Sequence, residues 1–310
     1  MSMIDHHTDN VHLLGIDMNT PSRNIAIVTG ANNGIGFETT VGMAEVGFHV
    51  VMACRSPEKV EAAEADVMKR VPSASLDVML LDLSDLASVR AFAEAFRRRY
   101  SKLDVLINNA GILLYSAQTN GESIELQFAT NHLGHFLLTA LLFDMVLDDP
   151  ASRIVALSSL GHMGAKFHFD DLSCGGDGGV AYGQSKLACL LFGDELDRRL
   201  RAAGRRARAL AVHPGGSESG LFQSVDPDQL AQMKAQVEQF LHSPASAAKP
   251  TLYAALSPDV EGGDYYGPIG PQEMSGEVGE ATRDPVTQDV ETAKRLWSLS
   301  EEMTSQVFLV

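Results

Sequence analysis

The chain has 310 residues, of which 45% are hydrophobic and 21% charged. This composition is typical of a globular protein with one large α/β domain or two small ones. The formal net charge is −16 and the sequence pI is about 4.9. So acidic a chain argues against nucleic acid and against anionic membrane surfaces as partners.

Cysteine use and the N-terminal segment point to a reducing compartment. Cys54, Cys174 and Cys189 are odd in number and form no C-x-x-C pair, which argues against a disulfide framework and a zinc site. Residues 1–23 form a polar extension without the features of a signal peptide. The longest apolar run, 136–147, is too short to span a bilayer. We therefore expect a soluble cytoplasmic protein without a membrane partner or metal.

From residue 24 onward, strand-like and helix-like runs alternate. Nearly continuous apolar runs predict strands at 25–28, 49–53, 75–81, 104–107, 153–157 and 207–212. The runs between them predict helices at 34–47, 57–70, 87–100, within 123–146, and at 182–203. This alternation indicates a parallel sheet covered on both faces, which is a doubly wound α/β (Rossmann) fold. Ligands of such folds bind beyond the carboxyl ends of the strands.

The rhythm breaks after the sixth predicted strand. Residues 216–250, which include an amphipathic piece at 228–241, are interpreted as a flap over the active site. A C-terminal extension at about 258–310 holds a turn-rich stretch at 261–268 and a last helix at 287–304. Without internal repeats, we expect one domain over 24–310.

A glycine-rich turn follows the first strand. Gly30, Gly34 and Gly36 stand there with Asn32, Asn33 and Ile35 between them. Glycines permit a tight turn and close approach of a pyrophosphate to a helix N-terminus. The spacing is G-x-x-x-G-x-G, which differs from the commonest dinucleotide fingerprint. A glycine-rich turn without a ligand is the alternative.

The second strand ends in Arg55 and Ser56, where an NAD-binding fold commonly places a carboxylate. A guanidinium suits a 2′-phosphate, so NADP is favoured. Asn33 adds no second positive charge, so NAD stays possible, and a solvent-facing arginine is the alternative reading of Arg55. Two further strand ends predict contacts on the adenosine side. Asp82 and Leu83 follow the third strand, and Asn109, Ala110 and Gly111 follow the fourth.

Tyr182 and Lys186 are four residues apart on one predicted helix and share a face. A nearby ammonium lowers the pKa of a phenol and equips it as an acid/base. The alternative is an ordinary amphipathic helix. Ser159 ends the fifth strand, where its hydroxyl can bind the reacting oxygen. Asn131 lies in the helix after the fourth strand and can bend it or hold a water near Lys186, with helix packing as the alternative.

His132 and His135 lie near Asn131 without a third metal ligand. We interpret them as packing or surface residues.

These motifs resemble the short-chain dehydrogenase/reductase family over about residues 24–215. The resemblance rests on the turn at 29–36, Asp82, the Asn108–Gly111 segment, Asn131, Ser159, Tyr182, Lys186 and the His213–Gly215 segment. The segments at 53–55, 130–136 and 158–162 are similar to the retinol dehydrogenase and carbonyl reductase branch.

The resemblance implies a role for each residue. Tyr182 is the general acid/base, Lys186 lowers its pKa and holds the nicotinamide ribose, and Ser159 orients the substrate oxygen. Asn131 supports a proton relay. Pro214 and Gly215 pack beside the nicotinamide, and Ser217 or Ser219 stands where a threonine often contacts the cofactor amide. Ser159 and Tyr182 are farther apart than usual in the family, with an insertion at 161–180 between them.

We therefore predict an NADP-dependent oxidoreductase that interconverts a carbonyl and an alcohol on a small apolar substrate. The residues expected to line its pocket are Leu160, Met163 and Phe167 of the insertion and Leu221, Phe222, Leu230, Met233 and Phe240 of the flap. The alternatives are a catalytically silent dinucleotide-binding sensor or scaffold and, less favoured, a relative of the sugar-nucleotide epimerases. The two long helices offer a face for a possible homodimer.

Overall fold

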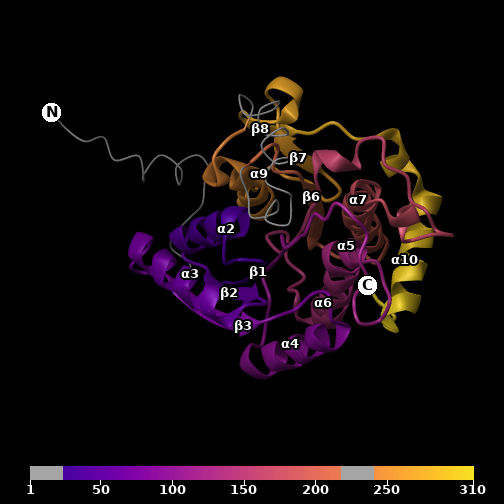
Figure 1. The fold of residues 1–310 in the computed structure, drawn as a ribbon. Helices are drawn as coiled ribbons and strands as arrows, with labels where there is room; N and C mark the ends of the chain where they lie inside the picture. The colour runs from indigo at the N-terminus through magenta and orange to yellow at the C-terminus, as the bar shows by residue number, and fades with distance from the viewer. Residues whose placement is uncertain (1–23, 218–240) are drawn as a thin grey trace.

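The computed structural model describes residues 24–217 and 241–310, whose elements are labelled in Figure 1. One sheet of eight strands runs through this part of the chain in the order β3-β2-β1-β4-β5-β6-β7-β8. Neighbouring strands from β3 to β7 are parallel, and β8 is antiparallel to β7. The predicted doubly wound Rossmann fold is confirmed. The strands are β1 (Ile25–Thr29), β2 (His49–Cys54), β3 (Ser75–Leu80), β4 (Val105–Asn108), β5 (Arg153–Leu157), β6 (Arg208–Val212), β7 (Tyr265–Pro268) and β8 (Val278–Glu280).

Helices cover both faces of the sheet, as Figure 1 shows. One face carries α2 (Gly34–Glu45), α3 (Pro57–Arg70) and α9 (Pro244–Leu256). The other carries α4 (Leu86–Arg99), α5 (Leu126–Phe128), α6 (Gly134–Leu142), α7 (Gly178–Ala202) and α10 (Val290–Thr304). Short helical turns lie at Phe143–Met145, Leu160–His162, Cys174–Gly176, Pro271–Glu273 and Pro285–Gln288.

The central strands are apolar at every position because both of their faces are buried. Ile27 packs into the core beneath α4, α6 and α7, whereas its neighbour Val28 packs into the core beneath α2, α3 and α9. Leu106 and Ile107 divide between the same two cores. Successive side chains of a strand point to opposite faces, so a continuous apolar run is what a doubly covered strand requires.

The helix predicted within 123–146 is interrupted around Asn131. A π-helical turn, Ala129–Leu133, separates α5 from α6, and the Gly134 amide donates to the Ala129 carbonyl five residues back. Such wide turns in a helix are found frequently at functional sites.

The structure departs from the sequence predictions at three places. Helix α7 begins at Gly178 rather than at 182, because Asp177 caps its N-terminus by accepting from the amides of Gly179 and Val180. The stretch interpreted as turn-rich contains β7, and β8 follows it. At the end of the expected flap, helix α9 packs on α2 and on the sheet. Residues 218–240 of that flap lie outside the described part of the chain.

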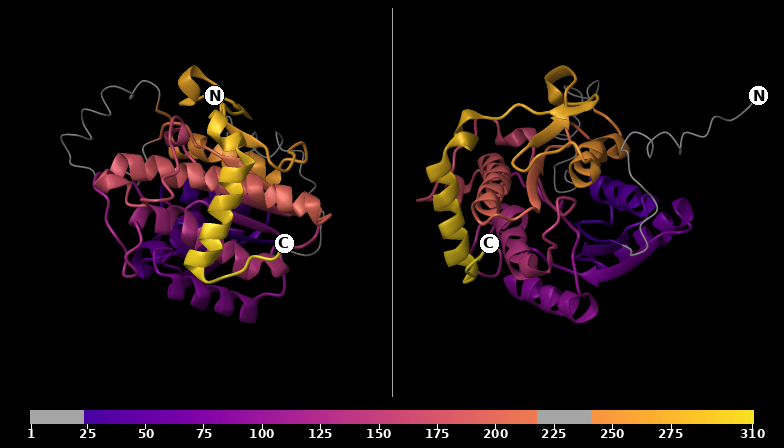
Figure 2. Two further views of the ribbon diagram at one scale, coloured as in Figure 1. Left: turned by 90° about the vertical axis from the view of Figure 1, so that its right-hand side faces the viewer. Right: turned by 180° about the vertical axis from the view of Figure 1, so that it is seen from behind.

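The last helix lies across α7 on the outside of the molecule, as the left view of Figure 2 shows. Trp297 of α10 is 2% exposed. Its indole stacks on Phe192 of α7, meets Phe136 of α6 edge-on, and stacks on Phe308 near the end of the chain. Part of the helical face that we considered for a homodimer is therefore covered by the chain itself.

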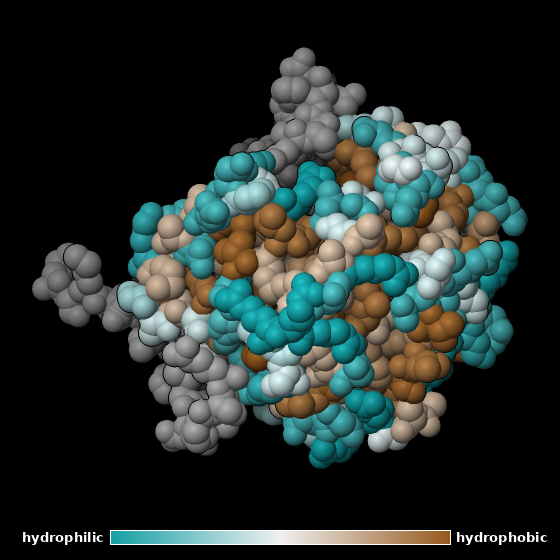
Figure 3. All heavy atoms as spheres, turned by 90° about the horizontal axis from the view of Figure 1, so that it is seen from below, coloured by the Kyte–Doolittle hydropathy of each residue, from teal (hydrophilic) through white to brown (hydrophobic). Residues whose placement is uncertain are grey.

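The surface of the described residues is mixed in polarity. On the face in Figure 3, hydrophobic patches are interrupted by hydrophilic residues. Residues 24–217 and 241–310 contain no helix with the length and apolar character needed to cross a bilayer.

Candidate active site

The glycine turn connects β1 to α2 at the carboxyl edge of the sheet. Gly30 and Gly34 have φ angles of 67° and 51°, a left-handed conformation that favours glycine. A Cβ on Gly36 would lie 2.5 Å from Asn109 Nδ2 and closer still to the Gly30 carbonyl. The first turn of α2 therefore packs directly on the backbone of the glycine turn, which leaves no room for a side chain at position 36.

Among the residues that the structure describes, no side chain caps the N-terminus of α2. Asn33 occupies the cap position without accepting a hydrogen bond, and the first turn carries no acidic residue. Free N–H groups and the positive end of the helix dipole are thus available to an anion at this edge. Beneath the turn, burial raises the pKa of Cys54 to about 12, partly offset by hydrogen bonds from the Ala31 and Asn32 amides.

Thr29 and Asn109 join the glycine turn to the end of β4. The Thr29 hydroxyl accepts hydrogen bonds from the Asn109 and Ala110 amides, each at 2.9 Å. In return, Asn109 Nδ2 donates to the Thr29 carbonyl at 2.7 Å. The predicted residues 109–111 therefore lie beside the predicted turn at 30–36, and buried hydrogen bonds fix their positions.

Arg55 and Asp82 lie near each other at the ends of β2 and β3. Arg55 is exposed, and its guanidinium lies 3.9 Å from the Asp82 carboxylate. Asp82 Oδ1 accepts from the amide and hydroxyl of Ser84. The Ser56 hydroxyl donates to Glu58 on α3. Arg55 has solvent access and no close hydrogen bond to any residue of 24–217 or 241–310, so its fork can turn toward a ligand.

Leu83 differs from its neighbours because it is only 5% exposed. A Cβ on Gly134 would meet its backbone closely, with the Leu83 Cβ at 2.9 Å. Leu83 thus packs where α6 begins.

Ser159, Gly161 and Tyr182 come together at the end of β5. The Ser159 hydroxyl accepts from the Gly161 amide at 3.1 Å. A Cβ on Gly161 would lie 2.9 Å from the Tyr182 ring and 3.5 Å from Ser159 Oγ. Tyr182 and Ser159 are both partly exposed. The two predicted residues, 23 positions apart in the sequence, therefore meet across a glycine.

Lys186 lies on the same helix as Tyr182 and is only 3% exposed. Its ammonium donates to the Leu157 carbonyl at 2.9 Å and lies 6.0 Å from the centre of the Tyr182 ring. A Cβ on Gly111 would be 3.2 Å from this ammonium. The residue expected to tune the phenol thus lies between the ends of β4 and β5.

Asn131 clamps the segment after β4 to helix α7. Its Oδ1 accepts from the Ile112 amide at 2.8 Å, and its Nδ2 donates to the Ile112 carbonyl at 3.0 Å. The same Nδ2 donates to Ser185 Oγ at 2.9 Å, and Ser185 in turn donates to the Tyr182 carbonyl. All four predicted catalytic residues therefore converge within one hydrogen-bonded region.

Two side chains contact the Asn131 backbone in a way that the sequence analysis did not foresee. The Asn131 carbonyl accepts from the His135 ring at 2.9 Å and from the Cys189 thiol at 3.1 Å. Burial lowers the pKa of His135 to about 4 and raises that of Cys189. His135 was expected to pack or to face the surface. The contact could have been anticipated from the spacing, because His135 follows Asn131 by four residues and so lies on the same face of the helix.

The turn after β6 is held by a buried histidine. His213 Nδ1 accepts from the Gly215 amide at 3.2 Å, and its Nε2 lies 3.1 Å from the Glu273 carboxylate. Burial lowers the pKa of His213 to about 4 despite that carboxylate. The Pro214 carbonyl accepts from His242. Ser217 is 6% exposed, and its hydroxyl has no hydrogen-bond partner among the described residues.

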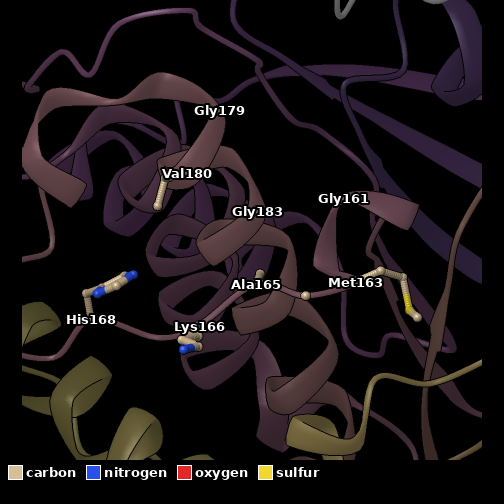
Figure 4. A pocket seen from close by; sticks show the side chains of 9 residues that line it. Gly161, Met163, Ala165, Lys166, His168, Gly179, Val180 and Gly183 are labelled. Atoms are coloured by element: carbon tan, nitrogen blue, oxygen red, sulfur yellow. The ribbon is translucent and has the colours of Figure 1, made fainter.

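A shallow pocket of about 320 Å³ lies between the insertion and the start of α7 (Figure 4). Gly161 and Gly183 form part of it, so the pocket borders Tyr182. Met163 lines this pocket, whereas Phe167 packs against Phe128. The full lining is Gly161, Met163, Gly164, Ala165, Lys166, His168, Gly179, Val180 and Gly183.

Known proteins that are similar to this chain support the family resemblance seen in the sequence. The family described as short chain dehydrogenase matches residues 24–230. Retinol dehydrogenase 13 from Homo sapiens is 36% identical over 293 residues, covering 89% of this chain and 83% of that protein. The crystal structure of an uncharacterized protein from Mycobacterium Paratuberculosis is 38% identical with a TM-score of 0.75, covering 93% of this chain and 96% of that chain.

An NADPH-bound short chain oxidoreductase from Pseudomonas aeruginosa PAO1 is 25% identical with a TM-score of 0.63, covering 79% of this chain and 96% of that chain. The fold, the order of the motifs and these relatives all indicate the same family. The chain therefore belongs to the short chain dehydrogenase family of oxidoreductases, in its retinol dehydrogenase-like branch.

Proposed function

We propose that this protein is an NADP-dependent oxidoreductase that interconverts a carbonyl and an alcohol on a small apolar substrate. The observation that carries the proposal is the convergence of Ser159, Tyr182 and Lys186 at the carboxyl edge that also holds the glycine turn. The short chain dehydrogenase family and its NADPH-bound member support a nicotinamide dinucleotide as the cofactor.

The residues present fit such a cofactor. The uncapped N-terminus of α2 and the glycine turn suit a pyrophosphate. The buried Ser217 hydroxyl, which has no partner within the described part of the chain, suits a carboxamide beside the Pro214–Gly215 turn. Asp82 and the 109–111 segment would hold the adenosine half, with Leu83 packed behind them. When bound, the nicotinamide supplies the hydride or accepts it.

The proton chemistry belongs to the chain's own residues. Ser159 donates a hydrogen bond to the substrate oxygen and orients it toward Tyr182. Tyr182 gives its phenolic proton to that oxygen during reduction and takes it back during oxidation. The Lys186 ammonium stabilises the phenolate by its positive charge. Asn131 keeps the backbone at Ile112 and helix α7 in register around this ammonium.

Replacing Tyr182 by phenylalanine tests the mechanism. We expect Tyr182→Phe to lose turnover across a panel of aldehydes, ketones and alcohols, followed by NADPH absorbance, while NADPH still binds. Tyr253→Phe is the matched control, because Tyr253 lies on α9, where its ring packs on Tyr266. Undiminished turnover in Tyr182→Phe would refute the mechanism. A wild-type protein that binds NADPH but turns over no member of the panel would favour a sensor or scaffold.

The choice of NADP rests on Arg55. We expect Arg55→Asp to raise the KM for NADPH at least tenfold relative to that for NADH, because a carboxylate repels the 2′-phosphate. Arg55→Lys keeps the charge but loses the planar fork, so it should fall between the two. The measurement is kcat/KM for both cofactors in each variant. A wild-type preference for NADH would contradict the assignment.

The substrate side is proposed from the pocket beside Tyr182. Met163, Ala165 and Val180 give it apolar walls, and Lys166 and His168 stand at its rim (Figure 4). An apolar carbonyl compound or alcohol fits these walls better than a highly polar one. The cytoplasmic location and the possible homodimer stay predictions from the sequence.

A further inference from the structure

His135 of α6 bridges the cofactor side and the catalytic side of the site. It is 3% exposed. One ring nitrogen, Nε2, lies 2.8 Å from the hydroxyl of Thr29, the residue immediately before the glycine turn. The other, Nδ1, lies 2.9 Å from the carbonyl of Asn131. A single imidazole thus contacts both halves of the proposed machinery.

The partners of His135 determine where its proton resides. The Asn131 carbonyl can only accept, so Nδ1 must carry the proton that it receives. The Thr29 hydroxyl already accepts from the amides of Asn109 and Ala110, which occupy both of its lone pairs. Its own proton is therefore left to donate to Nε2, which lies nearer than its other acceptor, the Ile107 carbonyl at 3.3 Å. Both contacts require the same neutral tautomer.

The surroundings also keep the ring uncharged. Desolvation is the main cause of its lowered pKa, and the nearby Lys186 ammonium lowers it further. A second proton on Nε2 would face a hydroxyl oxygen without a free lone pair. The imidazole therefore acts as a fixed connector at neutral pH, with one donor and one acceptor.

We propose that His135, in its Nδ1–H tautomer, is a positioning residue that sets the distance between the dinucleotide turn and the Asn131–Lys186 region. The inference rests on the proposed function. The Nε2 contact holds the Thr29 hydroxyl and through it the amides at 109 and 110. The Nδ1 contact holds the backbone of the π-helical turn, from which the Asn131 side chain reaches Ile112 and α7.

Two substitutions separate the two contacts. An asparagine amide reaches about as far as Nδ1, so His135→Asn keeps the donor to Asn131 and loses the acceptor for Thr29. A glutamine amide reaches about as far as Nε2, so His135→Gln keeps the Thr29 contact and loses the other. We expect His135→Asn to raise the Kd for NADPH five- to tenfold with kcat within twofold of wild type. We expect His135→Gln to lower kcat five- to tenfold with the Kd within twofold.

His132 supplies the matched control on the same helical segment. It is also a buried histidine, but its Nε2 contacts Ser300 Oγ of α10 at 2.8 Å, away from the cofactor turn. His132→Asn and His132→Gln should lower the melting temperature and leave both the Kd and kcat unchanged. This control separates a general loss of packing from a loss of positioning.

NADPH fluorescence gives the Kd without turnover, so the two proposals fail in distinguishable ways. A wild-type protein that binds NADPH without turnover removes the proposed function, yet the Kd of His135→Asn still tests the Thr29 contact. Two results with an active wild type would overturn the inference. In one, both His135 variants have the Kd and kcat of the wild type. In the other, their Kd and kcat change only in proportion to their melting temperatures, as general loss of packing would cause. Nitrogen-15 spectra of the wild type at pH 7 should show an imidazole with protonated Nδ1 and bare Nε2 that is lost in both His135 variants. A protonated Nε2 on that ring would also overturn it.

Discussion

Gly36 offers the sharpest test of how the backbone builds the dinucleotide turn. In Gly36→Ala, the new methyl group would start 2.5 Å from Asn109 Nδ2 and closer to the Gly30 carbonyl. Ordinary van der Waals contact begins near about 3.4 Å. The turn and helix α2 must therefore separate by about 1 Å, because the opposing carbonyl belongs to the backbone and cannot rotate away.

The expected effect on binding is much larger than the effect on stability. Alanine gains about 1 kcal/mol over glycine inside a helix, which offsets part of an overpacking cost of about 1–3 kcal/mol. The melting temperature should thus fall by only a few degrees. A hydrogen bond to a charged group such as a pyrophosphate contributes about 1.5–3 kcal/mol, so losing one through this displacement weakens binding by about 10- to 100-fold. We expect the Kd for NADPH, measured by fluorescence or calorimetry, to rise between 10- and 100-fold.

Gly42→Ala is the control on the same helix. Its new methyl group would start 2.6 Å from the end of the Leu252 side chain, which can move aside. The helix gain is the same, so Gly42→Ala should bind NADPH as the wild type does. If Gly36→Ala binds NADPH within twofold of Gly42→Ala, the turn is not fixed by this contact and the reasoning is refuted.

Two further predictions concern stability. Trp297→Ala should lower the free energy of unfolding by about 3–5 kcal/mol, because the indole fills the space between Phe136, Phe192 and Phe308. Denaturant melts should show a clearly smaller decrease for Trp297→Phe. Equal decreases in the two variants would contradict this account. Burial lowers the pKa of His132 to about 3, so the unfolded state binds a proton that the native state refuses. As the pH falls from 6.5 to 4, this histidine alone should lower the free energy of unfolding by up to about 3 kcal/mol, in addition to the losses at the buried His135 and His213. The free energy of unfolding of His132→Phe should fall less over the same pH range, as urea melts at each pH would show. If it falls with pH as steeply as that of the wild type, the pH dependence does not come from His132.

The sequence predicted the alternation of strands and helices because doubly covered strands need continuous apolar runs such as Ile25–Val28. It also predicted the residues that meet at the site, since the carboxyl ends of parallel strands share one edge. It missed β7 and β8, because Gly267 and Pro268 are typical of turns and short edge strands carry a weak pattern. The start of α7 at Gly178 was missed because glycines opposed the signal of the Asp177 cap.

The connections behind the site were harder to predict. Hydrophobic periodicity does not reveal the π-helical turn at 129–133. The Asn131 carbonyl in this turn accepts hydrogen bonds from side chains of two helices, His135 of α6 and Cys189 of α7. The contact between His135 and Thr29 spans 106 positions. Local patterns predict which face of an element is buried. They do not predict which polar atoms meet once the elements have packed.

Helix α10 has a consequence for how the protein matures. On the outer side of the helix that bears Tyr182 and Lys186, Phe192 stacks on Trp297, more than a hundred positions later in the chain, and Phe308 stacks on the same indole. During synthesis, this helix therefore emerges from the ribosome long before the residues of α10 that cover it. Until Trp297 has been synthesised, Phe192 lacks the indole that stacks on it, and a nascent chain at that stage exposes apolar surface on this helix that the finished protein buries.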